Sequence, residues 1–205
     1  MNEEQFWTLI EYSAHDGRDR DKRARTRWLE AKLAVLRGRA VIDFEVYLDQ
    51  ARCGVDTYDM WGAAHRISGF ASSDGFFYFQ PWLIGLGRES YRRAAAAPDC
   101  LSEMPEVRAL AAMPHPWPNA VFPAWEELNY VALHAYQRLN GENVDVRDVI
   151  ESTGRRLRSS PEPSGARWRI DEDSETRARL PRLAALFPRQ ARFDRRVPDN
   201  GQRAD

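Results

Sequence analysis

Side chains able to perform acid–base chemistry or to hold a polar ligand gather between residues 61 and 74. Trp61 and His65 are four residues apart, so on a helix they share one face. Ser73 and Asp74 follow within a short polar stretch, GFASSDG, at residues 69–75. These side chains supply an indole, an imidazole, a hydroxyl and a carboxylate, which are common groups in catalytic and ligand-binding sites. This segment is therefore the first candidate for a functional site.

Two sets of roles follow from these residue types. In an enzyme, His65 is the candidate general acid or base, and Asp74 is the carboxylate that orients it or binds substrate. In a binding site, the candidate contacts are Trp61, Ser73, Phe79, Trp82 and Arg88. Structural roles stay open for the same positions: Asp74 or a serine before it can cap a helix, His65 suits a helix C-terminus, and the aromatic rings suit a core.

Two helices joined by a short turn are predicted to position these residues. Thr57 can cap a helix that runs to about residue 68, and a second helix is predicted to start at Phe76, bend at Pro81 and continue to residue 97. Because the turn is short, we expect antiparallel neighbours, with His65 within about 10 Å of residues 72–74. Gly62 costs about 1 kcal/mol inside a helix, which indicates close approach of another helix or of a ligand.

Apolar residues recur at helical spacing along most of the remaining chain, and no alternating pattern predicts a strand. Asn2 is the expected N-cap of the first helix. Further helices are predicted over residues 3–15, 21–37, 39–52, about 104–112, 122–139, 144–152 and 173–187. The predicted fold class is all-α, a compact multi-helix single domain with a mobile Arg/Pro/Ser loop and a disordered C-terminal tail.

The composition changes after residue 153 and divides the chain. Residues 1–153 predict a helical domain, and residues 154–172 predict a flexible loop. Residues 173–188 predict a C-terminal helix that packs on the domain, and residues 189–205 predict a disordered tail. The loop carries a local basic excess, with a single glutamate, Glu162, against Arg155, Arg156, Arg158, Arg167 and Arg169.

Charge and missing signatures exclude several classes of protein. The 205 residues carry 30 basic and 31 acidic side chains, so the chain lacks the basic excess of a typical nucleic-acid binder. Neither a membrane helix nor a signal peptide is indicated, and Cys53 and Cys100 do not make a disulfide framework. We therefore predict a cytoplasmic protein. Zinc-binding, Walker and Rossmann signatures and the nucleophile elbow are missing, so we expect no metal and no cofactor.

Several segments, in the same order, resemble a bacterial family called domain of unknown function 4240. They are MNEEQFWTLIE at the start, WGAAHRISG at 61–69, SSDGFFYFQPWLIGLGRE at 72–89, PDCL at 98–101, and YVALHAYQRLNG and RLPRLAALF further on. The family pattern has two consecutive aspartates where this chain has Ser73 and Asp74, and an arginine where it has Gln80. If the acidic pair performs catalysis in the family, this member lacks half of it. The resemblance implies a fold and points to the same segment, without an activity.

Three functions remain open. The first is a binding or regulatory module that holds an unknown small-molecule ligand or a protein partner near the helix–turn–helix corner at residues 61–82. The second is an enzyme of unrecognised type that uses His65 and Asp74. The third is nucleic-acid binding through the arginine-rich residues 154–169, which the balanced total charge disfavours.

Overall fold

Helices form the whole of the regular structure in the part of the chain that the structure describes. The structure is a computed structural model and describes residues 1–15, 21–36, 38–69, 72–157 and 162–188. The α-helices are α1 (Glu3–His15), α2 (Lys22–Leu36), α3 (Gly38–Gly54), α4 (Tyr58–Ser68), α5 (Ser73–Gly85), α6 (Arg88–Ala96), α7 (Pro105–Ala111), α8 (Val131–Asn140), α9 (Val146–Ser152), α10 (Asp173–Arg179) and α11 (Pro181–Leu186). Two 3₁₀ helices are η1 (Pro98–Glu103) and η2 (Glu126–Tyr130). The predicted all-α fold is confirmed.

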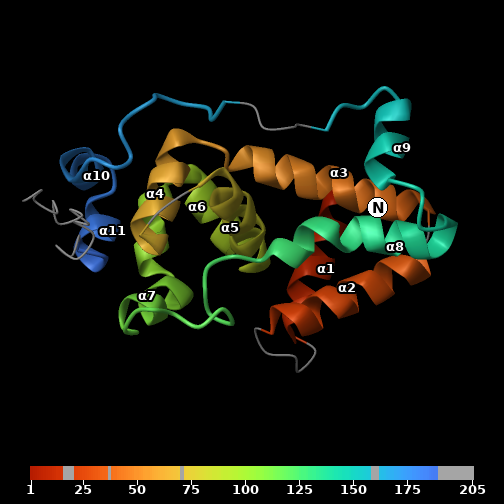
Figure 1. The fold of residues 1–205 in the computed structure, drawn as a ribbon, viewed down its shortest axis with the longest axis horizontal. Coiled ribbons are helices and arrows are strands. Elements are labelled where there is room, and N and C mark those ends of the chain that lie inside the picture. The colour runs from red at the N-terminus through yellow and green to blue at the C-terminus, as the bar shows by residue number, and fades with distance from the viewer. Residues whose placement is uncertain (16–20, 37, 70–71, 158–161, 189–205) are drawn as a thin grey trace, which may run out of the picture.

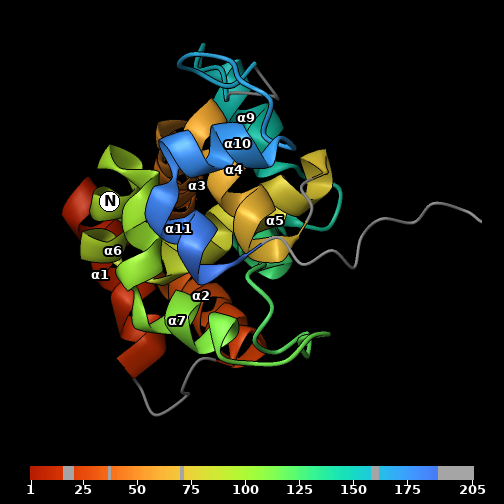
Figure 2. The same cartoon turned by 90° about the vertical axis from the view of Figure 1, so that its left-hand side faces the viewer.

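The helices form two groups that meet along α3 and α5 (Figure 1). At one end of the molecule α8 packs on α2 and α3, with α1 beneath and α9 above. At the other end α10 and α11 pack on α4 and η1 (Figure 2). Residues 154–157 after α9 and residues 162–172 before α10 both lie along the top of the molecule in Figure 1.

Side-chain caps start the helices where the sequence predicts them. Asn2 Oδ1 accepts the Gln5 amide at 2.9 Å, and Gln5 Oε1 accepts the Asn2 amide at 2.9 Å, so the predicted N-cap is part of a reciprocal pair. Thr57 Oγ1 accepts the Met60 amide at 3.1 Å at the start of α4. Gly69 ends α4 with a φ of 81°, a left-handed conformation that favours glycine.

The second predicted helix is two helices in the structure, α5 and α6, rather than one that continues to residue 97. The helix continues past Pro81 and ends at Gly85, and Gly87, with a φ of 95°, separates it from α6. Pro81 has no N–H to donate to the Phe77 carbonyl. The Asn129 side chain donates to that carbonyl instead, at 3.4 Å, so a distant residue compensates for the lost helical bond.

Two further helix predictions are wrong in their extent. Residues 122–139 do not form one helix, because the 3₁₀ helix η2 precedes α8 and the Trp125 amide donates to the Tyr78 carbonyl at 2.9 Å rather than within a helix. Residues 173–187 form two helices, α10 and α11, because Leu180, which precedes Pro181, leaves the helical conformation with a φ of −129° and a ψ of 57°.

An arginine lies inside the apolar core. Arg25 on α2 is 7% exposed and has its guanidinium 4.3 Å from the Trp125 ring centroid. It donates to Ser13 Oγ at 3.0 Å, to the Ile10 carbonyl at 3.2 Å and to the Gly85 carbonyl at 2.9 Å. Burial lowers the pKa of Arg25 to about 10. One guanidinium thus joins α1, α2 and α5.

Candidate functional site

A cavity of about 800 Å³ lies where the end of α3, the start of α4 and the start of α5 meet residues 162–170. We call it the corner cavity, and we call residues 162–170 the strap. Its aromatic lining is Tyr58, Trp61, Phe76, Phe77 and Trp168. Its charged lining is Asp49, Asp56, Asp74 and Glu162 with Arg52, Arg147 and Arg167. The volume is typical of a small-molecule site.

Three of the residues singled out from the sequence line this cavity. Trp61 comes from α4, and Ser73 and Asp74 come from the first turn of α5. The half-buried His65 is not among the lining residues, although it belongs to the same helix as Trp61. The structure therefore joins the indole, hydroxyl and carboxylate of the predicted corner and leaves the imidazole outside the cavity.

The remaining candidates have structural surroundings. Phe79 and Trp82 are 1% and 7% exposed and pack on each other in the core, with ring centroids 5.2 Å apart. Arg88 forms ion pairs with Glu3 and Glu4 on α1. None of the three lines the corner cavity.

Asp74 does not cap α5. The N-cap is Ser72, whose Oγ accepts the Gly75 amide at 3.0 Å. Asp74 follows in the first turn with an exposed side chain, and it makes no hydrogen bond or ion pair to the described chain. Its carboxylate thus remains available at the cavity.

Trp61 is held in place from two sides. Its Nε1 donates to Asp56 Oδ1 at 2.9 Å, and its ring stacks on Phe76 with centroids 4.1 Å apart and an interplanar angle of 24°. Stacked aromatic pairs of this kind add about 0.5–1.5 kcal/mol beyond the area that they bury. Asp56 accepts this bond without an ion-pair partner in the described residues.

The strap is hydrogen-bonded to the start of α4. The Ser164 amide donates to the Asp56 carbonyl at 2.9 Å, and the Tyr58 amide donates to the Ser164 carbonyl at 3.1 Å. The Tyr58 hydroxyl donates to Glu162 Oε1 at 2.7 Å. These bonds place the strap over one side of the cavity. The flexibility predicted for residues 154–172 stays a prediction.

Gly62 makes room for the indole of Trp168. A Cβ atom at Gly62 would lie 2.2 Å from Trp168 Cζ2, closer than any side chain permits. Trp168 is 7% exposed, its Nε1 donates to Asp59 Oδ1 at 2.8 Å, and the Arg179 guanidinium lies 5.5 Å from its ring centroid. The sequence predicts a close neighbour at Gly62, and that neighbour is the strap rather than a helix or a ligand.

Paired charges lie beneath the aromatic walls. Arg52 Nη2 is 3.2 Å from Asp49 Oδ1 and 3.8 Å from Glu45 Oε1, and Arg147 Nε is 3.1 Å from the same Glu45 oxygen. Glu45 is 1% exposed and its Oε2 has no hydrogen-bond partner. Burial raises the pKa of the Glu45 carboxyl, and the two arginines offset part of this effect.

The family model described as Protein of unknown function (DUF4240) matches residues 1–138. The chain belongs to this family. No curated protein and no solved structure matches the chain significantly. The segment matched to DUF4240 supplies the α3, α4 and α5 walls of the corner cavity, whereas Arg147 and the strap lie beyond it.

Two structural features bear on what this DUF4240 chain does. Across the described ranges, no helix is both long and apolar enough to span a lipid bilayer. Within those same ranges, no group of three or more histidine, cysteine, aspartate or glutamate side chains is arranged to hold a metal ion. Cys53 and Cys100 are not joined in a disulfide bond.

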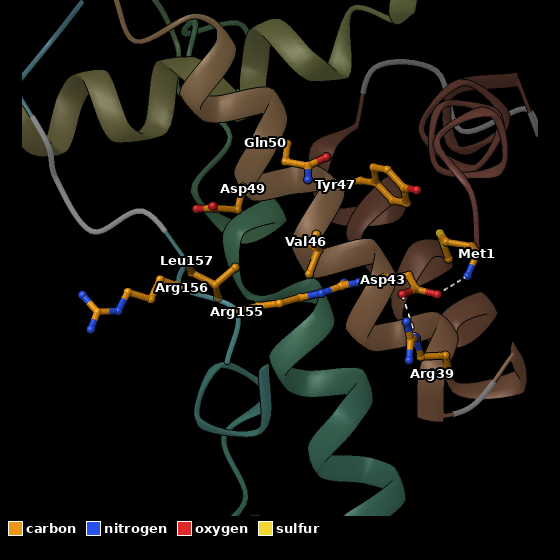
Figure 3. Close-up of a pocket in the computed structure, with 10 residues that line it drawn as sticks. All are labelled: Met1, Arg39, Asp43, Val46, Tyr47, Asp49, Gln50, Arg155, Arg156 and Leu157. Atoms are coloured by element: carbon orange, nitrogen blue, oxygen red, sulfur yellow. Dashed lines mark hydrogen bonds and ion pairs between the residues drawn. The ribbon is translucent and has the colours of Figure 1, made fainter. Parts of the chain in front are cut away.

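A second cavity, of about 550 Å³, lies beside the first residues of this DUF4240 chain (Figure 3). We call it the N-terminal cavity. Asp43 sits between the Met1 ammonium group, with which it forms an ion pair, and Arg39, whose Nε is 3.0 Å from Asp43 Oδ1. Arg155 extends toward this group, and Arg156 points away from it. Burial alone would raise the pKa of Asp43, but its two cationic partners hold the pKa below the usual value.

The described arginines among residues 154–169 do not gather on one surface. Arg155 and Arg156 line the N-terminal cavity, whereas Arg167 lines the corner cavity and lies 3.8 Å from Glu162. Arg169 pairs with Glu175 at 3.1 Å. Arg158 lies outside the described residues.

Proposed function

We propose that this DUF4240 member is a binding module of the bacterial cytosol that holds a small-molecule ligand in the corner cavity. The observation that carries the proposal is the cavity itself. It joins the predicted residues Trp61, Ser73 and Asp74 to a distant strap around about 800 Å³. A concave site of this size with aromatic walls and a few polar groups suits a small ligand better than a flat protein surface does.

The walls of the cavity are fixed by contacts within the protein. Trp61 is held by Asp56 and Phe76, and the strap is held through Ser164 and Trp168. Preformed walls support the proposal because a ligand then binds without the entropy cost of ordering them. A regulatory role would follow if the strap changes position between the free and the bound state.

The two other functions have less support. General acid–base catalysis by His65 with Asp74 requires both side chains on one cavity, and only Asp74 is in the lining. Nucleic-acid binding requires unpaired cations on a shared surface, whereas Arg167 and Arg169 pair with carboxylates and the other described arginines of the loop line a different cavity.

A thermal-shift screen tests the proposed binding. The purified protein is heated with metabolites, nucleotides, metal salts and short oligonucleotides, beside the variants Trp61→Ala and Trp28→Ala. Trp28 is a second half-buried tryptophan that lies outside both cavities, so it controls for the loss of an indole. A ligand at 100 times its dissociation constant adds about 2.7 kcal/mol to the free energy of unfolding.

The expected result is a stabilising small molecule whose effect disappears in Trp61→Ala and persists in Trp28→Ala. A molecule that stabilises all three proteins equally would place the ligand elsewhere. Stabilisation by oligonucleotides alone, lost at high salt, would favour nucleic-acid binding instead. An absence of any stabilising compound would contradict the proposal.

A further inference from the structure

The charges that line the corner cavity do not balance within the described chain. Each of its three arginines has an acidic partner: Arg52 pairs with Asp49 and Glu45, Arg147 with Glu45, and Arg167 with Glu162. The carboxylates of Asp56 and Asp74 have no ion pair in the described chain. The uncompensated charge at the cavity is therefore negative.

Aromatic rings share the cavity with these two carboxylates. Asp56 accepts the Trp61 N–H and Trp61 stacks on Phe76 at 4.1 Å, while Asp74 lines the same cavity from the first turn of α5. The indole bonds to one oxygen of Asp56, and within the described residues the second oxygen has no hydrogen-bond partner and the charge of the group has no ion pair. The two carboxylates and the stacked aromatic pair therefore line one cavity.

Aromatic faces beside unpaired carboxylates are suited to an organic cation. The negative face of an aromatic ring attracts a positive charge, and a nearby carboxylate adds a direct ion pair. An anionic ligand would compete with the carboxylates that already pair with Arg52 and Arg147, and with Glu162, which lies 3.8 Å from the exposed Arg167. A metal ion fits less well, because the described chain offers no group of three metal-ligating side chains here.

We propose that the corner cavity binds a small organic cation, an ammonium or amidinium group on a planar apolar body. The charged group lies near Asp56 and Asp74, and the body lies along Trp61 and Phe76. This inference rests on the proposed function and adds the chemical class of the ligand. The volume of about 800 Å³ leaves space for a body larger than one indole ring.

Three probes that share one indole body separate charge from shape. Tryptamine carries a cation, tryptophol is neutral and indole-3-acetate carries an anion. Their dissociation constants are measured by ligand-observed NMR and calorimetry with the full chain, at low and at high salt. We expect tryptamine to bind about tenfold more tightly than tryptophol, indole-3-acetate to bind most weakly, and the preference for the cation to shrink as salt screens the carboxylates.

Conservative variants assign the preference to the two carboxylates. Asp74→Asn removes an exposed charge, and Asp56→Asn keeps an acceptor for the Trp61 N–H. Asp148→Asn is the matched control, because Asp148 is also an exposed aspartate in the first turn of a helix and lies outside the cavity. We expect each cavity variant to weaken tryptamine binding about threefold to tenfold and to leave tryptophol binding unchanged, and the control to change neither.

The outcomes separate this inference from the proposed function. Equal binding of tryptamine and tryptophol, or tighter binding of indole-3-acetate, would overturn the cation inference and leave a ligand cavity in place. A cation preference that survives both cavity variants would place the charge recognition elsewhere and overturn it as well. If none of the three probes binds, the inference is wrong, and a ligand found by the screen would still support the proposed function.

Discussion

The corner cavity and the N-terminal cavity both lie along α3, and Asp49 lines both. In the N-terminal cavity Asp43 is bound by the Met1 ammonium group and by Arg39. In the corner cavity Asp56 and Asp74 have no cationic partner in the described residues. In the N-terminal cavity the charge of Asp43 is neutralised by groups of the chain itself. In the corner cavity the carboxylates of Asp56 and Asp74 are available for a ligand to neutralise. The volume of a cavity alone does not distinguish a ligand-binding site from a surface depression. The pairing of the charges that line the two cavities does distinguish them.

Two carboxylates of α3 show the same contrast at closer range. Asp43 and Glu45 are two residues apart, yet the pKa of Asp43 is lowered and the pKa of Glu45 is raised. Burial opposes ionisation at both. Two cations outweigh it at the partly exposed Asp43, whereas at Glu45 burial is more complete and one carboxylate oxygen has no partner. Near the corner cavity, therefore, the Glu45 carboxylate still carries a free-energy cost of burial, although two arginines pair with it.

The largest effect is expected at the strap. Trp168→Ala removes a buried indole and should lower the free energy of unfolding by about 3 kcal/mol. Gly62→Ala should lower it by about 1–2 kcal/mol, because the clash with Trp168 exceeds the gain in helix propensity. In the Trp168→Ala background, Gly62→Ala should instead stabilise by up to about 1 kcal/mol. Urea unfolding of the wild type, the two single variants and the double variant measures this cycle. Additive effects would show that the Trp168 indole does not pack against Gly62.

The pH dependence of Glu45→Gln gives the next largest effect. Because folding raises the pKa of Glu45, the contribution of this carboxyl to the free energy of unfolding is largest below pH 4.5, its ordinary pKa. That contribution decreases as pH rises through the pKa of the folded state. The glutamine variant does not titrate, so it should gain stability relative to the wild type as pH rises from acidic to neutral. Melting temperatures across this range test it, and a constant difference between the two proteins would contradict a raised pKa.

Asp43→Asn should show the opposite pH dependence in the other cavity. A lowered folded-state pKa means that the ionised carboxylate contributes stability above the ordinary value of 3.8, and that this stability is lost as pH falls through the folded value. The wild type should therefore be more stable than the asparagine variant at neutral pH, and the advantage should vanish in acid. Parallel pH profiles for the Asp43 and Glu45 variants would remove the contrast between the cavities.

The smallest effect is expected for Arg39→Ala. The Arg39 side chain is 73% exposed, and solvent screens its ion pair with Asp43. The loss in the free energy of unfolding should be about 0.5 kcal/mol or less, because the Met1 ammonium group still binds Asp43. Chemical denaturation measures it. A loss comparable to that of Trp168→Ala would mean that the N-terminal cavity is as important to the fold as the strap.

Local features of the structure were predictable from the sequence, because short-range chemistry determines them. The caps at Asn2 and Thr57 depend on residues three positions away. Trp61, Ser73 and Asp74 lie within 14 residues of one another across a single turn, and all three line the corner cavity. The predicted continuation to residue 97 is wrong, because the helix ends at Gly85 and α6 starts after Gly87. The Asn129 side chain, distant in sequence, donates to the Phe77 carbonyl that Pro81 leaves without a helical donor.

The other half of the cavity was not predictable in this way. Trp168 lies more than 100 residues after Gly62, and no local rule pairs the two. A signal was present: a lone tryptophan in a polar stretch that otherwise reads as a loop, together with a costly glycine inside a helix. Each indicates an unidentified neighbour, but only the fold shows that they contact each other. The same holds for Arg147, whose partner Glu45 lies on α3.

The guanidinium of Arg25 has a consequence for how the molecule opens. Its donors reach carbonyls of α1 and of α5 from a position on α2, and no carboxylate of the described residues forms an ion pair with it. If either neighbouring helix detached alone, a buried cation would lose hydrogen bonds before water could replace them. The three helices should therefore open together, and their amide hydrogens should exchange with solvent as one cooperative unit. The α5 wall of the corner cavity would then share the kinetic protection of the core, while the strap could open independently.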